Sequence, residues 1–481
     1  MAREVSLKFP DKLVEQRVDS GPDGSSNSVR ITNLSPVFGG GAEPGISSEF
    51  PEVRASSVRG HLRFWWRATR GTKFDLPEMR QRESEIWGST ALPSPVSLDI
   101  VVHSCSRPEP CVKWDDAMSW QAPFDRYRGS LPYVLFPFQG TSPDKKDAVA
   151  PAKFINHMDF TVSVGLPSQQ RRLSLKDHYN KLREEKKLSP LKEEIDFRAD
   201  VECAFWAWIN FGGIGARTRR GCGALRCTGW DFPSKTPLPG SMNEYPEWYR
   251  EMASYFGVDI PASNSPRPWP TAFRDAALGP KEYNDGIDAW SDVISIYKKF
   301  RQGVTTDANK HRYRSPRWPE AESVKGLVRE DRGATATAGL VQANRCNLSA
   351  PAFPRVSFGL PIIMELRNER IAGEDKDVKP TLQISESVDR MASPLILKPL
   401  ALSSGKVLPA IFVLLTPPMK AAYVAPGAHD LSVGVPLLAD NIWRDDMFDY
   451  PNSPMELVPV EEREHVTSAV DAFFEYAISK K

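Results

Sequence analysis

The segment GGIGARTRRGCG, residues 212–223, constrains the fold of this 481-residue chain more than any other stretch. It holds five glycines, three arginines and no acidic residue. Because glycine loses more conformational freedom on ordering than any other residue, the segment disfavours a regular helix or strand. Residues 195–210 before it repeat apolar side chains at helical spacing, and residues 224–230 after it are typical of a strand. We therefore expect a buried helix, a basic loop and a strand, in that order.

This order excludes two glycine-rich phosphate-binding loops. A P-loop ends in Gly-Lys-Ser or Gly-Lys-Thr, and residues 212–223 contain no such triplet. A dinucleotide-binding loop follows a strand and opens a helix, whereas this loop follows a helix and opens a strand. Two interpretations remain open: a basic loop that lies along a phosphate backbone, or a glycine-rich turn with solvated arginines.

We predict that a phosphate backbone lies against the loop. The predicted anion ligands are Arg217, Arg219 and Arg220, because a planar guanidinium donates two parallel hydrogen bonds to one phosphate. Glycine has no Cβ and lets the main chain approach a ligand closely. The remaining contacts predicted in the loop are Gly213, Gly215 and Gly221.

Residues 54–73 form a second basic segment, with six arginine or lysine side chains and no acid. We expect a helix over 56–71, with Ser56 or Ser57 as its N-cap and Gly71 as its stop. Four of its arginines then fall within an arc of about 80°. Trp66 lies between this row and the apolar face, so stacking on a base and burial both stay open. The contacts predicted here are Arg54, Arg59, Arg63, Arg67 and Trp66.

A third basic segment lies between Arg301 and Trp318, with five basic residues against one acid, Asp307. Its predicted contacts are Arg312, Arg314 and Arg317. The net charge of the whole chain is only +1, so nucleic-acid binding rests on these local concentrations and not on the total. Elsewhere the signs mix, as in residues 181–194, which we interpret as a solvated helical face.

Catalytic and metal motifs find little support. The six cysteines lack zinc-ligand spacing, so we expect reduced thiols, no metal and no cofactor. The seven histidines are scattered, and two of them, His61 and His311, lie inside basic segments. Either could act as a general acid or base in metal-free RNA cleavage, or be an ordinary packed or surface side chain.

The chain is long enough for more than one domain, and strands and helices mix in both halves. We expect an α+β fold with a first domain over 1–230, interrupted by an insertion at about 75–190, and a second over 231–481. The longest apolar run, 407–415, is too short to cross a bilayer, and the N-terminus has no secretory pattern. We therefore expect a cytoplasmic protein without a membrane partner. Elements expected in the second half are a helix at 288–300, strands at 355–366, 394–402 and 407–415, and a helix at 465–479.

The loop glycines also carry a resemblance. Gly213, Gly215, Gly221 and Gly223 give the spacing G-x-G-x5-G-x-G, which resembles the signature loop of the RAMP proteins of CRISPR systems. Residues 53–71 narrow the match, because they resemble the early-helix motif of the first-numbered subunit family of the Cmr (type III-B) complex. The second half resembles the same family at 315–324, 353–362 and 390–402.

The resemblance implies two ferredoxin-like (RRM-like) domains with long insertions and the loop between the last helix and last strand. It implies a non-catalytic RNA-binding subunit that caps the 3′ end region of the guide RNA and assists target RNA capture in antiviral defence. The implied partners are guide (crRNA) and target RNA and the other RAMP subunits. Two alternatives stay open: a RAMP endoribonuclease that processes precursor guide RNA, and a protein scaffold without direct RNA contact.

Overall fold

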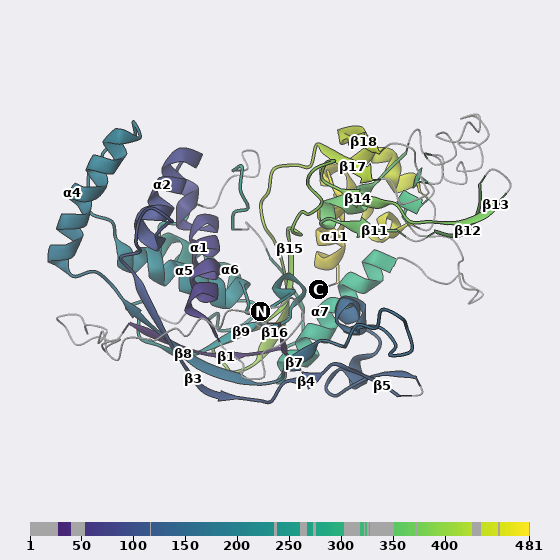
Figure 1. The fold of residues 1–481 in the computed structure, drawn as a ribbon, viewed down its shortest axis with the longest axis horizontal. Coiled ribbons are helices and arrows are strands. Elements are labelled where there is room, and N and C mark those ends of the chain that lie inside the picture. Colours follow the sequence, from purple (N-terminus) through teal and green to yellow (C-terminus); the bar gives the residue numbers. More distant parts are fainter. Residues whose placement is uncertain are drawn as a thin grey trace, which may run out of the picture.

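The computed structural model describes residues 27–39, 53–115, 117–234, 238–259, 267–272, 276–302, 318–321, 323, 324, 327, 351–364, 366–371, 374–425, 434–450 and 453–480. Within these ranges the protein is a mixed α+β structure with antiparallel sheets (Figure 1). The described part contains no helix that is both long and apolar enough to cross a membrane.

The first sheet joins four strands in the order β3-β8-β1-β9, all antiparallel to their neighbours. Two helices, α1 and α5, pack together on one face of it (Figure 1). Along β8 buried and half-buried residues alternate, as expected for a strand with only one face covered. The bounds are β1 Ser28–Asn33, α1 Ala55–Ala68, β3 Ser97–Cys105, β8 Met158–Gly165, α5 Phe197–Phe211 and β9 Leu225–Trp230.

The range 75–190 is not an insertion as a whole, which corrects the sequence-based prediction. It supplies β3 and β8, two of the four strands of the first sheet. Leu76–Trp87 and Gln169–Glu185 form helices outside the sheet, and the residues between the two strands form short elements. Those are β4 Glu109–Pro110, β5 Val112–Trp114, β6 Met118–Trp120, α3 Pro132–Leu135 and β7 Lys153–Ile155, with β2 Val37–Phe38 paired to β7.

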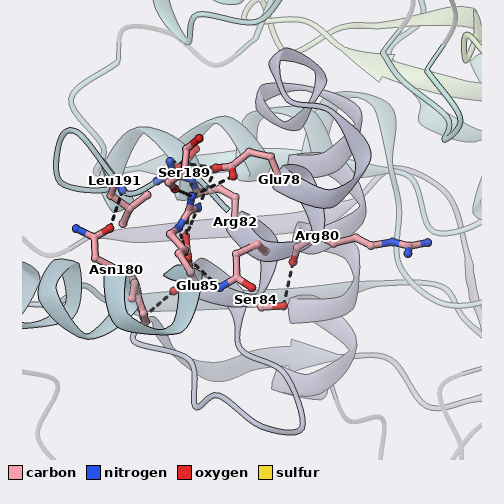
Figure 2. Close-up of polar contacts among 12 residues, drawn as sticks. Glu78, Arg80, Arg82, Ser84, Glu85, Asn180, Ser189 and Leu191 are labelled. Carbon is pink, nitrogen blue, oxygen red and sulfur yellow. Dashed lines mark hydrogen bonds and ion pairs between the residues drawn. The ribbon is translucent and has the colours of Figure 1, made fainter. Parts of the chain in front are cut away.

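Helices α2 (Leu76–Trp87) and α4 (Gln169–Glu185) lie beyond α1 and are joined by buried ion pairs (Figure 2). The Arg183 guanidinium, only 1% exposed, donates to Glu85 at 2.7 Å and to Glu78 at 2.9 Å. The Tyr179 hydroxyl adds a 2.9 Å bond to the Glu85 carbonyl. The mixed-charge run at 181–194 is therefore not simply a solvated face, because one of its arginines is the centre of this network.

The second half contains a three-stranded sheet in the order β10-β16-β15. Helix α7 packs on β15 and β16, and α11 packs on α7, β10 and β16. The strands predicted at 394–402 and 407–415 and the helices at 288–300 and 465–479 are confirmed. The bounds are β10 Ala276–Leu278, α7 Gly286–Gln302, β15 Leu395–Ala401, β16 Val407–Val413 and α11 Ala469–Ile478.

A smaller antiparallel sheet, β11-β14-β17-β18, has its own apolar cluster (Figure 1). The strand predicted over 355–366 is wrong at its start, because Pro354–Phe358 forms a 3₁₀-helix and extended structure begins only at Ile362. The bounds are β11 Ile362–Ile363, β12 Leu366–Ile371, β13 Glu374–Val378, β14 Thr381–Gln383, β17 Ala421–Ala425, β18 Val435–Leu438 and α10 Ala439–Ile442.

Each of the two larger apolar cores contains residues from both sides of residue 230. Phe124 and Phe138, from the segment between β3 and β8, share a core with Trp290 of α7. In the other direction, Trp248 of α6 (Tyr245–Tyr255) packs against Trp206 of α5 in the first core. The end of β9 near residue 230 is thus not a border between two separately packed cores.

Candidate nucleic-acid interface

The glycines of residues 212–223 fit the loop against the protein itself. Gly215 and Gly221 have φ values of +83° and +86°, which favour glycine. A Cβ at Gly215 would collide with the Phe38 carbonyl oxygen, and one at Gly221 with the Trp290 indole nitrogen. At Gly213 a Cβ would come within 2.8 Å of the Gly223 carbonyl oxygen. We correct the prediction for these three glycines, because the space they leave is filled by the protein and not by a ligand.

The amides of the loop are also used internally. The Ala216 amide donates to the Phe38 carbonyl at 2.7 Å, and the Gly223 amide donates to the Pro36 carbonyl at 2.9 Å. The Ile214 amide donates to the Gly223 carbonyl at 2.9 Å. The loop is therefore folded against β2 by hydrogen bonds of its own main chain.

Arg219 and Arg220 connect this loop to the second half of the chain by hydrogen bonds. The Arg219 guanidinium donates to the Ser393 carbonyl, and that of Arg220 donates to the Leu395 carbonyl at 3.1 Å. Burial, with the neighbouring Arg220 charge, lowers the pKa of Arg219 to about 10. The Arg219 guanidinium also lies 5.6 Å from the ring centre of Phe64 on α1. The loop and α1, far apart in the sequence, meet at this contact.

The arginine row of α1 carries more positive charge than its partner cancels. Arg63 Nε and Arg67 Nη1 both bind the same oxygen of Glu83, each at 2.7 Å. Their side chains stay 34% and 32% exposed, while Glu83 is 7% exposed. Arg59 binds Ser94 Oγ at 2.6 Å and the Val96 carbonyl at 3.0 Å. Burial, followed by the charge of Arg63, lowers the pKa of Arg59.

Trp66 is fully buried, and its indole nitrogen donates to Asp200 Oδ1 at 2.9 Å. Stacking of Trp66 on a base is therefore excluded, and the apolar side of α1 extends further around the helix than the periodicity indicated.

The helix begins at Ala55, one residue before Ser56, and its N-cap is the exposed Arg54, whose side chain makes no cap bond.

Comparison with known proteins finds similarity over the first half of the chain. The model of the RAMP superfamily matches residues 30–226, from β1 to β9. Residues 30–226 of the chain therefore resemble the RAMP superfamily. It is 24% identical over 199 residues to the CRISPR system Cmr subunit Cmr1-2 of Pyrococcus furiosus, across 40% of this chain and 90% of that protein. Subunit Cmr1-1 of the same organism is 35% identical over 57 residues, which cover 11% of this chain and 17% of that protein. The crystal structure of Cmr1 from Pyrococcus furiosus in its apo form is 15% identical, covers 85% of this chain and 93% of that chain, and has a TM-score of 0.44.

Of the two histidines singled out in the sequence, the structure describes His61. His61 stacks on Trp208 with ring centres 5.8 Å apart and an interplanar angle of 11°. Burial lowers the pKa of His61, so its neutral form is favoured. The other histidine singled out, His311, lies outside the described residues, as do Arg312, Arg314 and Arg317.

Sequence reasoning missed one lysine that holds the start of the glycine loop in place. Lys398 of β15 is completely buried, and its amino group donates to the carbonyls of Ile209 and Gly212 at 2.9 Å each. Burial lowers the pKa of Lys398 to about 7. It caps the end of α5, where the loop begins. No signal in LILKPLA marks this lysine, because its partners are main-chain groups of another segment.

Proposed function

We propose that the chain is an RNA-binding subunit of a type III-B Cmr effector complex. It contacts guide (crRNA) and target RNA and assembles with the other RAMP subunits. Its role is to cap the 3′ end region of the guide and to assist capture of target RNA in antiviral defence, in the cytoplasm. The sequence similarity to the Cmr1 subunits supports this proposal.

The observation that carries the RNA-binding part is the meeting of two basic segments. Phe64 of α1 lies under the Arg219 guanidinium, so the arginine row of α1 and the glycine loop form one surface. On that surface Arg63 and Arg67 share one carboxylate, that of Glu83. The excess positive charge suits a polyanion, and partly exposed arginines suit its phosphates.

The fold that supports this surface is, in our proposal, a pair of ferredoxin-like units. The first runs β1, α1, β3, β8, α5, β9, which is the β-α-β-β-α-β order. The second runs β10, α7, β15, β16, α11, and in both sheets the third strand lies between the first and the second. The segments between α7 and β15 and between β16 and α11 are the long insertions of the second unit.

Crosslinking inside the assembled complex tests the proposal. Guide and target RNAs that carry 4-thiouridine should crosslink to this chain, with peptides from 53–71 or 212–223 modified. Crosslinks concentrated near the 3′ end of the guide support the capping role. A complete complex that crosslinks the RNA only through other subunits would leave the scaffold alternative in its place.

We also propose that the chain does not cleave RNA by itself. The stacking of His61 on Trp208 and its lowered pKa support a packing role for that residue. The purified chain should leave a precursor guide transcript intact over hours. Specific cleavage that disappears in His61→Ala or His311→Ala would favour the endoribonuclease alternative.

A further inference from the structure

Arg217 combines three unfavourable features that the fold leaves uncompensated. Its φ of +56° lies in the left-handed region, which is costly for a residue with a Cβ. Its Nε is buried and has no hydrogen-bond partner in the part of the chain that the structure describes. Burial, followed by the charge of Arg220, lowers its pKa. An arginine with a strained main chain, an Nε without a partner and a repelled charge contributes nothing evident to folding, so a ligand is the simplest reason for its presence.

Two further guanidiniums, those of Arg220 and Arg301, flank the ring of Tyr297 on α7, and the Arg220 amide donates to the Arg217 carbonyl at 2.8 Å. Arg220 lies 5.2 Å and Arg301 lies 5.8 Å from the ring centre of Tyr297. Burial alone would raise the pKa of Tyr297, but the charges of Arg220, Arg301 and Arg217 lower it. Tyr133, from the segment between β3 and β8, completes the group with its ring 6.1 Å from that of Tyr297.

The group carries more positive than negative charge. The acid whose charge reaches Arg301 is Glu320, and Glu320 already accepts a 2.7 Å bond from the Arg355 amide and lies 3.1 Å from Arg355 Nε. No ion pair of Arg217, Arg220 or Arg301 with a carboxylate occurs among the residues described. The Arg220 guanidinium donates to the main-chain carbonyls of Leu395 at 3.1 Å and Phe358 at 3.4 Å, and these neutral acceptors do not balance three cations.

We infer that Arg217, Arg220 and Arg301 hold one phosphate group of the bound RNA where the glycine loop, α7 and α3 meet. The inference rests on the proposed function and deepens it, because it assigns one phosphate to a site that sequence patterns did not bring together. Arg219 does not belong to this site, since its guanidinium lies over Phe64 of α1. The phosphate accepts the unused hydrogen of Arg217 and offsets the mutual repulsion of the guanidiniums.

Melting temperature with and without phosphate tests the inference on the full chain. Sodium phosphate, compared with sodium chloride at equal ionic strength, should raise the melting temperature of the parent. The rise should be lost in Arg217→Gln and in Arg301→Gln. Arg80→Gln is the matched control, because Arg80 projects from α2 toward solvent and away from the network of Figure 2, and it should respond like the parent.

The phosphate-free samples separate a binding role from a structural one. Without phosphate, Arg217→Gln should melt no lower than the parent, because the change removes an unbonded donor and a repelled charge. A lower melting temperature for this variant, or an unchanged phosphate response, would overturn the inference. Equal stabilisation of the parent by a polyglutamate peptide would assign the site to protein carboxylates and overturn it as well.

RNA affinity separates this inference from the proposed function. For a single-stranded 12-mer, Arg217→Gln should weaken binding several-fold while Arg80→Gln does not. If the parent binds RNA and Arg217→Gln binds it equally well, the phosphate site is refuted and the proposed function is not. A parent that binds no RNA but keeps an Arg217-dependent phosphate response supports the oxyanion site and refutes the proposed function.

Discussion

Gly221 shows how closely the loop fits the second half. Its φ of +86° and the collision that a Cβ would make with Trp290 both exclude other residues. Gly221→Ala should lower the free energy of unfolding by about 2 kcal/mol or more, since strain and overpacking add. Gly60, in the middle of α1 with open space around it, is the matched control. Gly60→Ala should stabilise by about 0.5–1 kcal/mol in urea unfolding. Equal effects at both positions would contradict the packing described for the loop.

Lys398 gives the protein a predictable dependence on pH. Its pKa of about 7 in the folded state is below the ordinary lysine value of 10.5, so the unfolded chain binds more protons between these limits. The free energy of unfolding should therefore rise as the pH increases from about 7 toward 10, by a total on the order of a few kcal/mol. Below pH 7 this gain in stability is absent. Lys398→Met should remove most of that slope in unfolding curves recorded from pH 7 to 9.5. A variant with the parent's slope would show that the amino group stays charged in the fold.

At the scale of elements, the ion pairs between α2 and α4 make the sharpest prediction. Helix α4 buries little besides Tyr179 and Arg183, so these contacts, and not an apolar face, hold it. Arg183→Met leaves the Glu85 carboxylate buried without its main partner, which should cost about 3–5 kcal/mol locally. Hydrogen exchange should then increase across α4 while α5 stays protected. Lys181→Met, an exposed neighbour on the same helix, should leave exchange unchanged.

Elements with a strong apolar period were predictable, and charged contacts were not. The helix predicted at 195–210 is observed as α5, and the strand predicted at 224–230 as β9. The 3₁₀-helix at Pro354–Phe358 escaped prediction because its apolar residues fit a strand equally well. Arg183 escaped because a run of mixed charges reads as a solvated face, whereas burial of one member depends on acids from another helix.

At the scale of the whole molecule, each of the two larger cores contains residues from both halves of the chain. We therefore expect each half to need the other in order to fold. A fragment of residues 1–230 would expose Phe124 and Phe138, which pack with α7, and would lack α6, which covers Trp206. We expect residues 1–230 and 231–481, expressed separately, to aggregate or bind the dye ANS, and to recover a sharp thermal transition only when co-expressed. A fragment of 1–230 with a cooperative transition of its own would restore the border predicted near residue 230.

At the candidate interface, the sequence predicts which segments are basic, but it does not predict which of their residues meet in the fold. Acid-free runs identified the arginines of α1 and of the loop. Their meeting at Phe64 and Arg219 depends on tertiary packing and was open in the sequence. Burial of Trp66 and the internal use of the loop glycines were likewise invisible, because aromatic and glycine residues serve packing and ligands equally well.

The salt dependence of RNA binding by three single variants tests the central claim most directly. Arg67→Gln removes a proposed phosphate ligand but leaves Arg63 on Glu83, Glu83→Gln removes the acid that Arg63 and Arg67 share, and Arg80→Gln removes a charge elsewhere. For single-stranded RNA the slope of log affinity against log salt should flatten by about 0.7 in Arg67→Gln, while Glu83→Gln should tighten binding at low salt. Arg80→Gln should match the parent in both affinity and slope. Folded Arg67→Gln and Glu83→Gln proteins that bind RNA with the parent's affinity and slope would contradict the claim that α1 and the glycine loop form an RNA-binding surface.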